Sequence, residues 1–140
     1  MKKKLDSVTT NIRNVGNNNF LAVDEFGNVA QSSSRFPWSL IQEGTNVRLK
    51  NAKGKFLQKD GNGLVLADDA LSPSTIASNR TPNLALQQFV ISRDGTTVFL
   101  KAATNERQVL AFEGADVLFA RFTDKNDAGI SKKSFVLDLV

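Results

Sequence analysis

The sequence predicts an all-β domain of about twelve short strands, arranged as three repeats of four strands each. The first observation is a motif that occurs three times: an isoleucine or leucine, a basic step, a polar turn, and an apolar pair ending in leucine. Its copies span residues 12–21, 49–57 and 100–110. The second observation is an aromatic apolar segment that follows each copy, at residues 38–41, 89–91 and 135–137. Together these features indicate one pseudo-threefold unit repeated three times.

We place the repeats at about residues 8–44, 45–95 and 96–140 of a single domain covering residues 1–140. One four-strand unit cannot bury its apolar face alone, so the three units must close on one another into a barrel-like core. We therefore expect Leu21, Leu57 and Leu110 to be buried together. Closure also predicts that the last strand, residues 135–140, pairs with residues 10–15 and sends Leu139 into the core.

The composition excludes several function classes. The chain of 140 residues contains no cysteine, histidine or tyrosine and carries a net charge of +4. Disulfides, thiolate metal sites and the usual nucleophile–base pairs cannot be built, so we expect no enzyme, no cofactor and no metal. No apolar run approaches the roughly 20 residues of a membrane span, and the basic start has no apolar stretch behind it. We expect no membrane span and a cytoplasmic protein, or one released without a signal peptide.

Three acids at equivalent places are the first candidate ligand residues. Asp24, Asp60 and Glu113 each lie three residues after the repeated leucine. Possible partners follow each of them, namely Asn28, Asn62 and Asp116. A carboxylate beside a hairpin can accept hydrogen bonds from the hydroxyl groups of a sugar. The alternative is that each acid caps its own turn through the backbone.

A run of cations within one predicted hairpin is the second candidate. It consists of Arg48, Lys50, Lys53, Lys55 and Lys59. The alternation with Val47 and Leu49 predicts that Arg48 and Lys50 share the solvent face. This basic ribbon could meet an acidic protein surface, or it could simply be a solvated face. Because the cations do not alternate with a series of aromatic residues for base stacking, we do not expect nucleic acid as a partner.

The second repeat contains an insertion rich in serine, threonine and proline, at residues 68–82. Arg80 lies in it, followed by Thr81 and Pro82. A loop presenting an arginine could enter a trypsin-like pocket, so a protease inhibitor is a further alternative.

Residues 20–29 and 55–63, in which an aromatic–leucine strand leads through an acidic turn to glycine, resemble the β-trefoil superfamily and within it the fascin-like domains. The resemblance implies a protein-binding module, with actin as the partner of known fascins. Ricin-type sugar binders carry Gln-x-Trp in each unit, whereas this chain reads Phe36-Pro37-Trp38, Gln87-Gln88-Phe89 and Lys133-Ser134-Phe135. The ricin subtype is therefore not expected, while a sugar site of another kind stays open.

The sequence thus predicts a non-enzymatic binding module, with glycan as the first ligand class. Fascin-like binding of actin or another acidic protein surface is the alternative, and loop-mediated protease inhibition is the third. The identity of the ligand and the oligomeric state stay open at this point.

Overall fold

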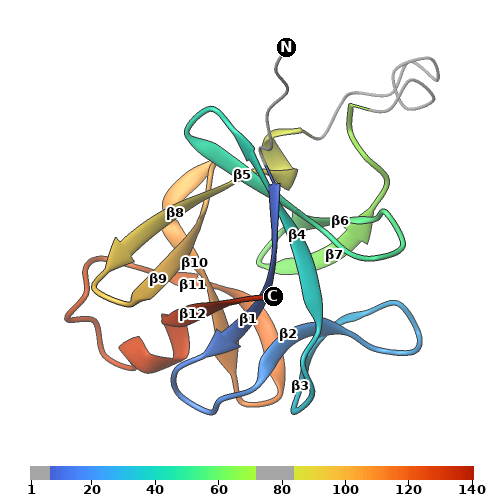
Figure 1. Ribbon diagram of the computed structural model, residues 1–140. Helices are drawn as coiled ribbons and strands as arrows, with labels where there is room; N and C mark the ends of the chain where they lie inside the picture. Colours follow the sequence, from blue (N-terminus) through green and yellow to red (C-terminus); the bar gives the residue numbers. More distant parts are fainter. Residues whose placement is uncertain (1–6, 72–83) are drawn as a thin grey trace.

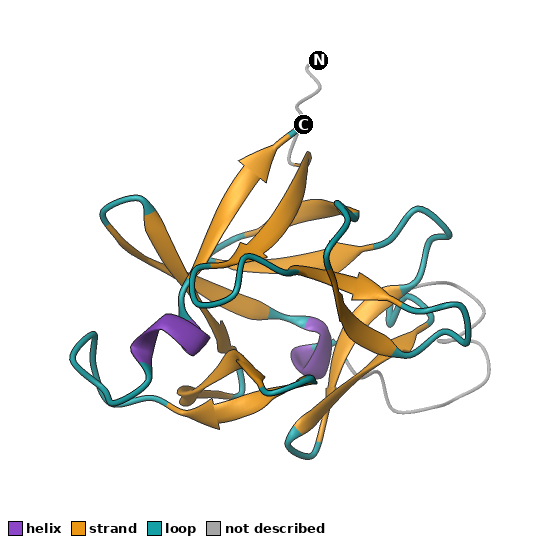
Figure 2. Ribbon diagram, turned by 90° about the horizontal axis from the view of Figure 1, so that it is seen from below, coloured by secondary structure: helices purple, strands orange, loops and turns teal. Residues whose placement is uncertain are grey.

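The computed structural model describes residues 7–71 and 84–140, and these residues form strands joined by turns and loops (Figures 1 and 2). The strands are β1 (Ser7–Asn14), β2 (Phe20–Val23), β3 (Val29–Ser32), β4 (Pro37–Glu43), β5 (Asn46–Lys50), β6 (Phe56–Asp60), β7 (Gly63–Ala67), β8 (Phe89–Asp94), β9 (Thr97–Ala102), β10 (Asn105–Glu113), β11 (Asp116–Arg121) and β12 (Phe135–Leu139). Two short 3₁₀ helices, η1 (Ala85–Gln87) and η2 (Ile130–Lys133), precede β8 and β12.

Six of the strands close into a barrel. β1 pairs with β4, β4 with β5, β5 with β8, β8 with β9, β9 with β12, and β12 with β1, always antiparallel. The pairing of β12 with β1 joins Leu139 to Thr10 and Phe135 to Asn14, so the predicted closure between the two ends of the sequence is confirmed. Figure 1 shows these two strands side by side. Closure leaves none of these six strands as an open edge of the barrel.

The other six strands form three hairpins, β2–β3, β6–β7 and β10–β11. The first strand of each hairpin also pairs with the barrel strand that precedes it, namely β1, β5 or β9. The same order of pairing therefore occurs three times along the chain, which is consistent with the three predicted repeats.

The core lies inside the barrel and beneath the hairpins. Leu21, Leu57 and Leu110 are at most 1% exposed and belong to one cluster, as predicted. The same cluster includes Trp38, Phe89 and Phe135, which come from the three aromatic segments recognised in the sequence. Burying large apolar side chains of this kind contributes about 1.5–3 kcal/mol each.

One prediction about side-chain direction needs correction, and one strand with an alternating pattern is buried on both faces. Leu139 was expected in the core but is 69% exposed; it pairs with Thr10 of β1 at the far end of β12, away from Phe135, where β12 pairs with β9. Phe99 alternates with core residues in β9, yet it is also buried, in a second cluster with Val109 and Phe122. β9 is therefore covered on both faces, which an alternating pattern does not predict.

No helix among the described residues is long and apolar enough to cross a membrane.

Candidate functional site

Each hairpin carries one residue directly opposite its buried leucine, and these three residues mark equivalent places. Gln31 pairs with Leu21, Leu66 with Leu57, and Phe119 with Leu110. Each lies next to the tip of another hairpin: Gln31 next to β10–β11, Leu66 next to β2–β3, and Phe119 next to β6–β7. Each also lies near the turn that leads into its own hairpin. Because the three residues differ in size and polarity, the three inter-hairpin positions differ in what they leave open.

At the first position Gln31 bridges the two sides. Its Nε2 donates hydrogen bonds to the carbonyl oxygens of Gly114 and Asp116, each at 2.9 Å. Its Oε1 accepts from Asn17 Nδ2 at 2.9 Å and from Asn19 Nδ2 at 3.1 Å. One amide thus joins the tip of β10–β11 to the turn before β2, and the two elements are held together.

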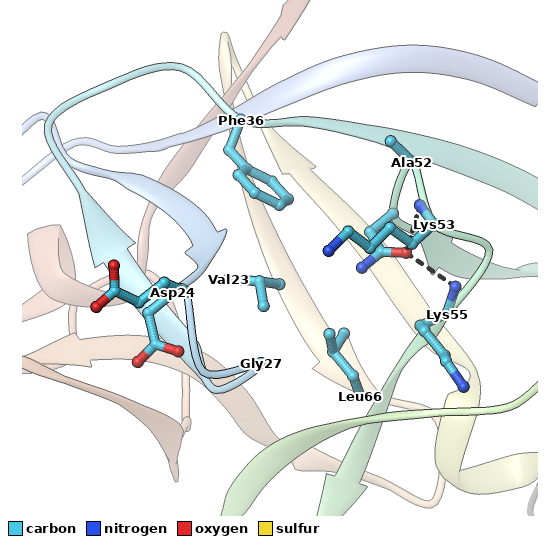
Figure 3. Close-up of a pocket in the computed structure, with 10 residues that line it drawn as sticks. Val23, Asp24, Gly27, Phe36, Ala52, Lys53, Lys55 and Leu66 are labelled. Atoms are coloured by element: carbon cyan, nitrogen blue, oxygen red, sulfur yellow. Dashed lines mark hydrogen bonds between the residues drawn. The ribbon is translucent and has the colours of Figure 1, made fainter.

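At the second position Leu66 makes no polar bridge, and a pocket of about 480 Å³ lies between the tip of β2–β3 and the turn before β6. Figure 3 shows its arrangement. Asp24 lies on one side of the pocket, and Lys53 and Lys55 lie on the other. Phe36, Val23 and Leu66 lie between the two sides, so the pocket has an apolar floor between an acidic wall and a basic wall.

The acidic wall is a tightly bonded turn. Asp24 Oδ1 accepts the backbone N–H groups of Phe26 and Asn28, each at 2.9 Å. The pKa of Asp24 lies below its ordinary value, chiefly because the Asn28 N–H donates to the carboxylate. Gly27 has φ +84°, a conformation that glycine adopts without strain. One carboxylate oxygen therefore caps the turn, and Oδ2 makes only a 3.5 Å contact with Asn28 Nδ2.

The basic wall is held by a buried asparagine. Asn51 Oδ1 accepts the backbone N–H groups of Lys53 at 3.1 Å and Lys55 at 2.8 Å. Gly54 has φ +83°, which permits the tight turn. The ammonium group of Lys55 pairs with Asp68. The side chain of Lys53 is exposed and extends from a turn that its own backbone stabilises.

The floor is fixed through Trp38. The Phe36 ring packs against the Trp38 ring with centroids 5.4 Å apart and planes tilted by 49°. Trp38 is fully buried, and its Nε1 donates to the carbonyl of Leu21 at 3.0 Å. Phe36 is half-buried, so one part of its ring meets the pocket. The floor therefore presents a preformed aromatic surface.

At the third position Phe119 is buried and a polar pocket of about 400 Å³ lies beside it. Asn62, at the tip of β6–β7, lines this pocket together with Asn105, Arg107, Gln108 and Arg121. The backbone N–H of Phe119 donates to the Asn62 carbonyl at 2.8 Å, which ties this hairpin tip to β11.

The three predicted acids lie at three different hairpin ends and do not converge on one site. Asp24 is joined to its predicted partner Asn28 and caps its own turn. Asp60 is paired with Gly63 across its turn. Glu113 lies opposite Asp116 and forms an ion pair with Lys132 at 2.8 Å. Of the three, Asp24 is the one that lines a pocket described here.

Arg48 does not belong to a surface ribbon, and the expectation that it shares the solvent face is wrong. It is 4% exposed. Its guanidinium pairs with Glu43 at 2.8 Å and with Asp69 at 2.7 Å, and it lies 4.2 Å from the centroid of the Phe56 ring. β5 is covered on both faces, so alternation alone could not assign the side chain. Of the remaining cations, Lys53 and Lys55 line the pocket in Figure 3. Lys50 and Lys59 are half-buried on the strands to either side.

Arg80 lies outside the described residues. Among the residues described, no group of three histidine, cysteine, aspartate or glutamate side chains is placed to hold a metal ion. The sequence analysis did not identify Phe36 and Leu66 as site residues. The position of Phe36 two residues before Trp38 was a signal for a second aromatic ring at this place. No local pattern indicates that Leu66 faces a pocket.

No protein-family model matches the sequence, and no curated protein matches it. Solved structures do match. The designed 3-fold symmetric protein ThreeFoil superposes with a TM-score of 0.70 at 14% identity, covering 93% of this chain and 97% of that one. SeviL, solved bound to asialo-GM1 saccharide, gives 0.68 at 12%, covering 93% and 95%. A GlcNAcα1-4Gal-releasing endo-β-galactosidase from Clostridium perfringens gives 0.74 at 12%, covering 95% of this chain but 32% of the enzyme. At such identities the likeness concerns the fold alone, and it supports a β-trefoil.

Proposed function

We propose that this chain is a non-catalytic glycan-binding module of the β-trefoil type, with three pseudo-equivalent units in one domain, and that the sugar binds in the pocket of Figure 3. The observation that carries this proposal is the apolar floor of Phe36, Val23 and Leu66 set between a carboxylate wall and an ammonium wall.

The chemistry of the walls favours a ligand rich in hydroxyl groups. A carboxylate only accepts hydrogen bonds and an ammonium only donates them, whereas a sugar hydroxyl does both. Asp24 Oδ2 can accept from one hydroxyl, and Lys53 Nζ can donate to another across the pocket. Bonds that involve a charged partner are the stronger ones, so they can orient the ligand.

The floor suits the other part of a sugar. A pyranose ring exposes an apolar face of C–H groups, which can pack on the half-buried ring of Phe36 and on Leu66. The pocket volume of about 480 Å³ lies within the range of about 300–1,000 Å³ that is typical of small-molecule sites. We infer that one or two sugar units occupy it.

The structural neighbours lend support at the level of fold. SeviL was solved with a saccharide bound, so a chain of this fold can present a glycan site. The endo-β-galactosidase matches over 32% of its own length, and its activity does not transfer to this chain. The fascin-like alternative and its acidic protein partner gain no support from Arg48, which lies in buried ion pairs instead of on the basic ribbon.

A glycan array with the purified protein is the first experiment, followed by calorimetry with the best oligosaccharide. Asp24→Asn keeps the Oδ1 acceptor that caps the turn but replaces the outward oxygen by an amide, so we expect weaker binding with only a small drop in melting temperature, from the loss of the charge that the N–H groups of the turn stabilise. Lys53→Gln should weaken binding in the same way.

Two matched controls carry the same charge changes away from the pocket, namely Asp60→Asn and Lys125→Gln. Both should bind as the unmodified protein does. If no oligosaccharide binds, or if binding is equally strong in Asp24→Asn and Lys53→Gln, the proposal is wrong.

A further inference from the structure

The polar pocket beside Phe119 differs in chemistry from the pocket of Figure 3. Its lining contains two arginines, three side-chain amides and one aromatic ring, and no carboxylate. The residues are Asn62, Asn105, Arg107, Gln108, Phe119 and Arg121. The neighbouring Lys59 ammonium lies 5.6 Å from the centroid of the Phe119 ring, which adds a third cation at the margin.

A bulge in β10 places two consecutive side chains in this pocket. The register of β10 against β9 shifts between Asn105 and Val109. In a regular strand Arg107 and Gln108 would point to opposite faces, but a bulge re-aims one of them. Gln108 pairs with Arg121 of β11, so the two guanidinium groups come from adjacent strands of one hairpin.

The acceptors of Asn62 and Asn105 in this pocket are already engaged. Asn62 Oδ1 accepts from Gln108 Nε2 at 3.3 Å, and the Asn62 carbonyl accepts from the Phe119 N–H at 2.8 Å. Asn105 Oδ1 accepts the backbone N–H of Arg107 at 3.0 Å. Gln108 Oε1 also remains as an acceptor, whereas the Nδ2 amides of Asn62 and Asn105 and the two guanidinium groups are donors, so donors predominate.

No ion pair joins Arg107 or Arg121 to a carboxylate among residues 7–71 and 84–140. Two like charges on one hairpin repel each other, and an anion between them would remove that repulsion. A group that offers several acceptor oxygens and negative charge matches the set of donors, and arginine's planar fork suits such oxygens.

We propose that this pocket binds a tetrahedral oxyanion, the phosphate or sulfate group of an ester. This inference is independent of glycan binding in the pocket of Figure 3, because the two pockets share no lining residue.

The experiment titrates the ¹⁵N-labelled protein with inorganic phosphate and with inorganic sulfate, following the side-chain amide signals of Asn62 and Asn105. Both signals should shift and saturate. Glucose 6-phosphate and glucose 6-sulfate then show which ester is preferred, with glucose as the neutral control. Glucose should leave the two signals unmoved.

Arg107→Gln and Arg121→Gln should each weaken binding of the preferred ester about tenfold, since each removes a charge-assisted hydrogen bond. Arg93→Gln is the matched control, because Arg93 lines a separate pocket with Val8 and Leu139. All three arginines are exposed, so melting temperatures should stay level. If neither ion shifts the amide signals, neither ester binds, or binding survives unchanged in both pocket variants, the inference is overturned.

Discussion

Gln31 and Leu66 occupy the same place in successive hairpins, each directly opposite a fully buried leucine. Gln31 bridges to the neighbouring hairpin through its amide, whereas Leu66 leaves a pocket there. The side chain at this repeated position therefore differs between a bridged position and an open one, while the backbone pairing is the same.

Replacing Gln31 by alanine should open the first position. The change removes two donated and two accepted hydrogen bonds, all at the partly exposed surface. We expect a loss of about 1 kcal/mol in the free energy of unfolding, because a net hydrogen bond contributes about 0.5–1.5 kcal/mol and exposed bonds contribute least. Urea denaturation measures it. The side-chain amide NMR signals of Asn17 and Asn19, which lose their acceptor, should shift in the variant, and unchanged signals would contradict the bridging role.

Substituting alanine for Leu21, Leu57 or Leu110 should destabilise the protein by about 2–5 kcal/mol in each case, through lost burial and the cavity left behind. The three leucines lie in one cluster and are at most 1% exposed, so similar losses are expected. Chemical denaturation of the three variants provides the test. A loss below about 1 kcal/mol at any of them would show that the surrounding core collapses onto the cavity.

Arg48 should matter for stability more than the exposed lysines. Arg48→Ala leaves Glu43 and Asp69 without their guanidinium partner; because these carboxylates are 23% and 35% exposed, we expect a cost of about 1.5–3 kcal/mol, typical of hydrogen bonds to charged groups. Lys55→Ala breaks the exposed pair with Asp68 and should cost no more than about 1 kcal/mol. The comparison is made by denaturation at neutral pH. Equal losses would contradict a structural role for Arg48.

Barrel closure depends on one end of β12 more than on the other. Phe135 is fully buried and pairs with both Asn14 and Val98, whereas Leu139 is exposed. We expect Phe135→Ala to cost about 3–5 kcal/mol and Leu139→Ala to cost within about 0.5 kcal/mol. Thermal melts of the two variants distinguish them, and a marked drop for Leu139→Ala would show that the rim of the barrel is covered in solution.

Acid should destabilise the fold, and neutral pH changes should have little effect. Burial raises the pKa of Asp69, but the hydrogen bonds from Arg48 and from the Leu71 N–H, together with the charges of Arg48 and Lys50, lower it by more, so it lies below its ordinary value. The pKa values of Asp24 and Asp127 are lowered chiefly by backbone N–H donors, from Asn28 and Thr123. Depressed pKa values in the folded state stabilise it above the ordinary value of 3.8, and this stability is lost as the pH falls below it.

Melting temperature measured from pH 8 to pH 2 tests this expectation. With no histidine in the chain, we expect a nearly flat profile from pH 8 to 5 and a decline below about pH 4. Asp127→Asn, which cannot titrate, should show a shallower decline. A steep change near pH 6 would contradict the assignment.

The repeated leucines, the aromatic segments and the closure of β12 on β1 could be predicted from the sequence, because each depends on a local pattern that recurs three times. The direction of Arg48, Phe99 and Leu139 could not, because alternation assumes that one face of a strand is solvated. β5 and β9 are covered on both faces, and Leu139 at the end of β12 is exposed.

The charged residues of the candidate site could be predicted from the sequence, but its apolar residues could not. Asp24, Lys53 and Lys55 attract notice as charged residues in polar turns, and the fold brings them to one pocket. Phe36 and Leu66 look like ordinary core residues in the sequence. Leu66 faces a pocket because of the length of the β2–β3 turn and because it lacks the amide with which Gln31 bridges the equivalent position. Both depend on contacts between repeats that are distant in sequence.

Gln87 is fully buried, and its amide fastens two segments that are separated in sequence. Its Oε1 accepts from the backbone N–H of Ala70 at 3.1 Å, and its Nε2 donates to the carbonyl of Asp68 at 2.8 Å. The stem that leaves β7 and the stem that enters β8 are thereby clamped at one point of the barrel. Residues inserted between the two stems do not change the distance between them. The entropic cost of holding the two ends together grows only slowly with the number of inserted residues. This junction is therefore the natural place to graft an epitope, a reporter or a second domain onto the protein without disturbing either pocket.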